Sequence, residues 1–117
     1  MAIDRQALDK LREIIGGEAA DLIELIDSFL EEGPLLAGRL AASQQAADVA
    51  GARRAAHSLK ANARDMGATE LAEICARLEA GCATGVVPGK ADIDAVEQAF
   101  AAAAVELRSM FPAEGSS

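Results

Sequence analysis

The chain has no tryptophan, no tyrosine and only three phenylalanines among its 117 residues, so aromatic side chains can fill little of a core. Strand-rich domains favour β-branched and aromatic residues, and this composition argues against them. The sequence instead holds 28 alanines, and alanine has the highest helix propensity of all residues. Together these features predict an all-α fold, and the length fits a single domain.

Basic residues are also scarce. Eleven lysines and arginines face nineteen aspartates and glutamates, which gives a net charge of −8. Nucleic acids and anionic membranes both attract basic surfaces, so neither is an expected partner. The sequence has no long uncharged apolar run, and its first residues carry neither a basic cluster nor an apolar segment. We therefore expect a cytoplasmic protein.

The sequence offers few residues for a disulfide or a metal site, since it has two cysteines and one histidine. Cys75 and Cys82 are seven residues apart in a helical pattern, which separates them by about 10.5 Å along a helix axis. That distance is too long for a disulfide bond. We expect two reduced, buried thiols and no metal or other cofactor in this chain.

The spacing of apolar residues predicts helices along most of the chain. Asp4 can cap a short first helix that places Ile14 on its apolar stripe and ends at a pair of glycines. A second helix is expected over residues 18–32. A third helix then starts at Pro34, with Leu35 on the apolar stripe, because proline suits the first turn of a helix. One long helix that continues through Pro34 is the alternative.

Three further helices follow. Asp48 is the expected cap of a helix that runs to about residue 66, Thr69 of the next, and Asp92 of the last. Residues 81–89 read as a loop because they are rich in glycine and proline. The whole pattern predicts an antiparallel four-helix bundle with an additional short N-terminal helix. We expect one domain over residues 1–111, with the bundle core at about 18–110 and a flexible tail at 112–117.

The helix expected after Asp48 has an unusual exposed face. On a helical wheel, its leucine, methionine and most of its alanines point to one side. The opposite side is centred on His57 and carries Arg53, Arg54, Lys60, Ala61 and Arg64. A basic face on an acidic protein suits the binding of a phosphate or of an acidic protein surface. The alternative is an ordinary solvated face with one chance histidine.

The residues around His57 also form a motif. It reads Ala56-His57-Ser58-Leu59-Lys60, then Gly67-Ala68, then a helix with Leu71, Cys75 and the pair Leu78-Glu79. This motif resembles that of the histidine-containing phosphotransfer (HPt) domains of bacterial phosphorelays, and the resemblance covers about residues 18–110. One departure is Ala61, because the family often has glycine at the position after the lysine.

The resemblance implies a function. His57 would accept a phosphoryl group from the aspartyl phosphate of a receiver domain and pass it to another receiver, and Lys60 would pair with the phosphoryl oxygens. Arg53, Arg54, Ala61 and Arg64 would then form the face on which the receiver docks. The expected partners are a hybrid sensor histidine kinase and a response regulator, with Mg²⁺ bound by the receiver and this chain acting as a monomer.

A carrier is expected rather than an enzyme with its own ATP site, since the sequence has no glycine-rich nucleotide-binding loop. The alternative is an HPt-like docking or inhibitor module that binds a kinase or a receiver without carrying phosphate. In that case His57 and Lys60 would have no chemical role.

Overall fold

The computed structural model describes residues 2–111, and the predicted tail over 112–117 lies outside this range. The described residues form five helices and no strands, which confirms the all-α fold. The helices are α1 (Arg5–Ile14), α2 (Ala19–Gln45), α3 (Val49–Asp65), α4 (Thr69–Ala83) and α5 (Lys90–Met110).

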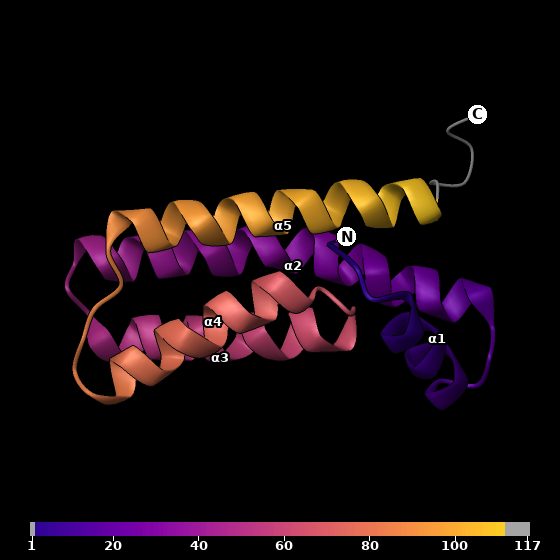
Figure 1. The fold of residues 1–117 in the computed structure, drawn as a ribbon, viewed down its shortest axis with the longest axis horizontal. Coiled ribbons are helices and arrows are strands. Elements are labelled where there is room, and N and C mark those ends of the chain that lie inside the picture. Colours follow the sequence, from indigo (N-terminus) through magenta and orange to yellow (C-terminus); the bar gives the residue numbers. More distant parts are fainter. Residues whose placement is uncertain (1, 112–117) are drawn as a thin grey trace.

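Helices α2 to α5 run alternately up and down the long axis of the molecule, and α5 lies along α2 (Figure 1). The α3–α4 hairpin packs beside them through contacts of α3 with α2 and of α4 with α5. The short helix α1 lies at the N-terminal end of α2 and also contacts α3 (Figure 1). The predicted antiparallel four-helix bundle with a short N-terminal helix is thereby confirmed.

Helix α2 corrects one expectation, because it continues through Pro34 instead of ending there. Proline disfavours a helical conformation of the preceding residue mainly by clashing with its backbone and its Cβ atom. The preceding residue is Gly33, which has no Cβ. Gly33 is also buried against the ring of Phe100 on α5, at a place where a Cβ would collide with that ring. Gly33 therefore both tolerates the following proline and lets α5 pack closely on α2. The alternative of one long helix is confirmed.

The ends of α3 follow the sequence closely. The Asp48 carboxylate accepts a hydrogen bond from the Gly51 amide at 2.9 Å, as expected of an N-cap. Beyond the other end, Gly67 has a φ of 74°, a left-handed conformation that glycine adopts without strain. Its carbonyl accepts a hydrogen bond of 2.7 Å from the Asp4 amide. The turn after α3 is thus attached to the segment that leads into α1.

Other boundaries differ by a few residues from the expected ones. Thr69 is the first residue of α4 and not its cap, and α4 continues to Ala83, into the segment expected to be a loop. Helix α5 begins at Lys90, so Asp92 lies within its first turn and is not its N-cap. The Asp92 carboxylate accepts a hydrogen bond of 2.9 Å from the amide of Gly89. Ile14 was expected on a buried stripe but is 75% exposed.

The core confirms the wheel of α3. Its buried side chains are those of one leucine and four alanines: Ala52, Ala55, Ala56, Leu59 and Ala63. Small side chains allow neighbouring helices to approach α3 closely, and Leu59 is fully buried. Because this face is buried, the rotation of α3 is set and His57 points to solvent. The core therefore positions the face that carries the histidine.

Candidate functional site

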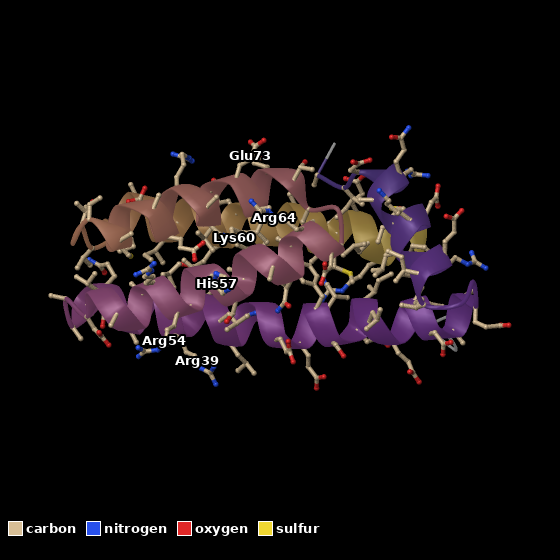
Figure 2. The ribbon with its side chains drawn as sticks, turned by 90° about the horizontal axis from the view of Figure 1, so that it is seen from below. Arg39, Arg54, His57, Lys60, Arg64 and Glu73 are labelled. Atoms are coloured by element: carbon tan, nitrogen blue, oxygen red, sulfur yellow. The ribbon has the colours of Figure 1, made fainter. Side chains whose placement is uncertain are left out.

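His57 lies near the middle of the exposed face of α3, and 63% of its side chain is accessible. Figure 2 shows Lys60 and Arg64 on the side of α4, and Arg54 and Arg39 on the side of α2. The predicted basic face exists on α3, since Arg53, Arg54 and Arg64 are all exposed. Arg39 extends it onto α2 and was not identified from the sequence.

A carboxylate from α4 binds the histidine. Nδ1 of His57 lies 2.6 Å from Oε2 of Glu79. An ionised carboxylate can only accept hydrogen bonds, so Nδ1 carries the hydrogen and donates it. In the neutral ring the lone pair is then on Nε2, the nitrogen that faces away from this contact. The Glu79 contact therefore determines which ring nitrogen can act as a nucleophile.

The same carboxylate pairs with the lysine. Nζ of Lys60 donates a hydrogen bond to Oε1 of Glu79. This contact is the first cause, followed by the hydrogen bond from His57, that holds the pKa of Glu79 below its ordinary value of 4.5. The Lys60 and Glu79 side chains are only 17% and 18% exposed, respectively. Among the described residues, Glu79 forms an ion pair with Lys60 and is also the hydrogen-bond partner of His57.

Two shallow pockets meet at His57. One, of about 410 Å³, is lined by Arg53, Arg54, His57, Ser58 and Glu79. The other, of about 510 Å³, lies between α2 and α3 and is lined by Glu32, Leu35, Leu36, Arg39, His57, Ser58, Ala61 and Asn62. The histidine is thus flanked by a basic pocket on one side and by a partly apolar groove on the other.

Leu35 corrects a further expectation. Its position in the apolar pattern predicted burial, yet it is 63% exposed at the edge of the groove beside His57. Ala61 is exposed and lines the same groove, so its methyl group lies next to the histidine without filling the pocket. Leu35 and Ala61 thus give the groove beside His57 its exposed apolar part.

The cysteines lie beneath this surface. Both are free and buried, as expected. Burial, followed by the negative charge of Glu79, raises the pKa of the Cys75 thiol to about 12, and burial also raises the pKa of Cys82. Thiols in this state are poor nucleophiles. Neither thiol is therefore a candidate nucleophile at this surface.

Other kinds of site were sought in the part of the chain that the structure describes. Residues 2–111 contain no cluster of three or more histidine, cysteine, aspartate or glutamate side chains that could hold a metal ion. No helix in this range is long and apolar enough to cross a membrane.

The fold and the site together define a class of protein: a helical bundle that exposes one histidine, one helical turn from a lysine, on an otherwise acidic chain. Comparison with family models gives the same answer, because the Hpt domain model matches residues 24–113. The chain therefore belongs to the Hpt domain family. No curated protein matches it in a sequence comparison.

A solved structure is also similar to the chain. It is the crystal structure of histidine-containing phosphotransfer protein B (HptB) from Pseudomonas aeruginosa PAO1. The two chains share 28% sequence identity and superpose with a TM-score of 0.85, and the match covers 93% of each chain. The likeness therefore includes nearly the whole of the bundle.

Proposed function

We propose that this chain carries a phosphoryl group on Nε2 of His57 between aspartate residues of receiver domains. The observation that carries the proposal is the contact between Nδ1 of His57 and Glu79. It leaves the Nε2 lone pair on an exposed ring, where an aspartyl phosphate can reach it. Membership of the Hpt family and the likeness to HptB support the same role.

The transfer step uses this lone pair. Nε2 forms a bond to phosphorus while the bond between phosphorus and the aspartyl oxygen breaks, and the aspartate leaves as a carboxylate. Phosphoryl transfer depends mainly on positioning and on charge stabilisation. Lys60, one helical turn from His57, can supply a positive charge to the phosphoryl oxygens. Mg²⁺ and the acidic pocket would belong to the receiver.

The surface around His57 is suited to a receiver. Leu35 and Ala61 give an apolar contact beside the histidine, and Arg39, Arg54 and Arg64 surround it with positive charge. A receiver carries acidic residues around its own phosphorylated aspartate, so the two surfaces are complementary. We infer that a hybrid sensor kinase supplies the phosphoryl group and that a response regulator receives it.

The test is phosphoryl transfer from a purified, ³²P-labelled receiver to the wild-type chain. Wild type should gain an acid-labile, base-stable label, and His57→Gln should gain none while keeping its helical circular dichroism. Lys60→Ala should remain folded and be labelled about tenfold more slowly, because a charge-assisted hydrogen bond is lost.

Two results would contradict the proposal. One is label on the His57→Gln variant, which would place the phosphoryl group elsewhere. The other is binding of receivers without any labelling of wild type, which would favour a docking or inhibitor module. Receiver binding is therefore measured alongside labelling, for wild type and for His57→Gln, so that these two results can be told apart.

A further inference from the structure

Glu79 fixes the hydrogen of the unphosphorylated ring on Nδ1, but its negative charge is unfavourable once the ring is phosphorylated. It places a negative charge 2.6 Å from the ring that would bear a phosphoryl dianion, and it pairs with the lysine that would neutralise that dianion. A carboxylate at this position repels the phosphoryl group. Its presence therefore indicates a second role that compensates for this repulsion. This role can be derived from the chemistry of the nitrogen–phosphorus bond.

After transfer to Nε2, both ring nitrogens of His57 are substituted, and the ring is cationic as long as Nδ1 retains its hydrogen. In the onward step, an oxygen of the acceptor carboxylate bonds to phosphorus and the nitrogen–phosphorus bond breaks. Its electron pair returns to Nε2, which yields a neutral imidazole. If Nδ1 has lost its hydrogen, the leaving group is an imidazolate anion, which is a far poorer leaving group.

We propose that Glu79 keeps phosphorylated His57 transferable, by holding the hydrogen on Nδ1 so that the phosphoryl group leaves a neutral imidazole. This inference rests on the proposed function and describes how Glu79 sets the reactivity of the phosphorylated histidine at the same site. The carboxylate stabilises the cationic ring through its charge and through its hydrogen bond. Glu79 is thus a positioning residue that makes His57 a rapid relay and not a store of phosphate.

Lys60 connects the two states of the site. Before phosphorylation its ammonium group pairs with Oε1 of Glu79 and shares the charge of that carboxylate. A phosphoryl dianion on His57, one helical turn away, attracts the same ammonium group. As Lys60 turns to the phosphoryl oxygens, the charge of Glu79 becomes fully available to the ring. Arrival of the phosphoryl group therefore strengthens the contact that prepares its departure.

Other charged and titratable groups border this ring, and the test must separate them from Glu79. Arg53 and Arg54 on α3 and Glu32 and Arg39 on α2 line the pockets beside the ring, whereas Lys60 on α3 and Cys75 and Cys82 on α4 lie near Glu79. Both thiols remain protonated because burial raises their pKa values. Among the acidic groups, Glu79 is the one with a hydrogen bond to Nδ1.

The experiment loads the protein with phosphoramidate, a small phosphate donor that needs no receiver. ³¹P NMR then follows the phosphohistidine signal against pH. Glu79→Gln keeps an oxygen acceptor for Nδ1 but removes the charge, so the midpoint of the ring titration should fall by about one pH unit. Above both midpoints the half-life of the label should lengthen about tenfold.

Glu73→Gln is the matched control. It removes the same charge from an exposed position on the same helix, away from His57 (Figure 2). Its midpoint and its half-life should equal those of wild type. Equal midpoints and half-lives for wild type and Glu79→Gln would overturn the inference.

A second measurement needs no variant and holds even if Glu79→Gln fails to fold. The midpoint of the wild-type phosphohistidine should lie above that of free Nε2-phosphohistidine, and a midpoint at or below the free value would overturn the inference. Loading by phosphoramidate but by no receiver would contradict the proposed function and leave this readout intact. Loading by a receiver with coinciding midpoints would contradict only the inference, and no loading by either donor would overturn both.

Discussion

At the scale of single residues, the site depends on one carboxylate shared by two side chains. Glu79 accepts hydrogen bonds from His57 and from Lys60, and these contacts lower its pKa. The residue was visible in the sequence only as part of the pair Leu78-Glu79. Nothing in the periodicity of α3 could place it beside His57, because the two residues are 22 positions apart and lie on different helices.

Glu79 also makes stability dependent on pH. A carboxylate whose pKa is lowered in the folded state stabilises the protein above its ordinary pKa of 4.5, and this stabilisation is lost as the pH falls through the lowered value. Glu79→Gln should therefore lower the melting temperature at pH 7 by up to about 4 °C. Thermal unfolding of both proteins from pH 7 to pH 3 checks this.

The difference in melting temperature should shrink as the pH falls from 4.5 through the lowered pKa of Glu79, because the carboxylate is protonated first in the unfolded chain and then in the folded one. Glu73→Gln, on the exposed face of α4, should show no such convergence. A gap between wild type and Glu79→Gln that stays constant down to pH 3 would mean that the charge of Glu79 contributes nothing to stability.

At the scale of elements, the end of α3 fixes where the histidine helix stops and how it joins α1. Gly67 has a left-handed conformation, and a Cβ there would lie 2.5 Å from the Asp4 carbonyl oxygen. Gly38 of α2 is the contrasting case, since it lies in a helix and a Cβ would meet nothing within 4 Å. The same substitution should thus have opposite effects at these two positions.

Gly67→Ala should destabilise the fold by about 2 kcal/mol or more, because the left-handed conformation is unfavourable for alanine and its Cβ would collide with the Asp4 carbonyl oxygen. Gly38→Ala should stabilise it by about 0.5–1 kcal/mol, because alanine has the higher helix propensity. Urea denaturation of both variants measures these changes. Destabilisation by Gly38→Ala, or no loss with Gly67→Ala, would contradict the packing described.

The same helices show which features of the fold can be predicted from the sequence. Local signals predicted the cap at Asp48, the turn at Gly67 and the outward face of His57, because each depends on neighbouring residues in one helix. The path of α2 through Pro34 was predicted only as an alternative, since it involves the packing of Gly33 against Phe100 from α5. The exposure of Leu35 was missed for a similar reason, because burial depends on what the other helices cover.

At the scale of the whole molecule, the residues that form the core and those that form the candidate site lie on opposite sides of α3. The alanine-rich side of α3 is buried, and the opposite side presents His57 between a basic pocket and a partly apolar groove. The chain carries a net charge of −8, yet five of its eleven lysines and arginines lie around this histidine: Arg39, Arg53, Arg54, Lys60 and Arg64. The acidic remainder of the surface disfavours binding of acidic partners in other orientations.

The most direct test of the central claim is a relay between two receivers. The chain is labelled by a phosphorylated donor receiver, purified away from it, and mixed with a second, unphosphorylated receiver. The account predicts that the label leaves the chain and appears on the aspartate of the second receiver, and that His57→Gln breaks the relay. Label that remains on the chain, or that reaches the second receiver equally well with His57→Gln, would contradict the account.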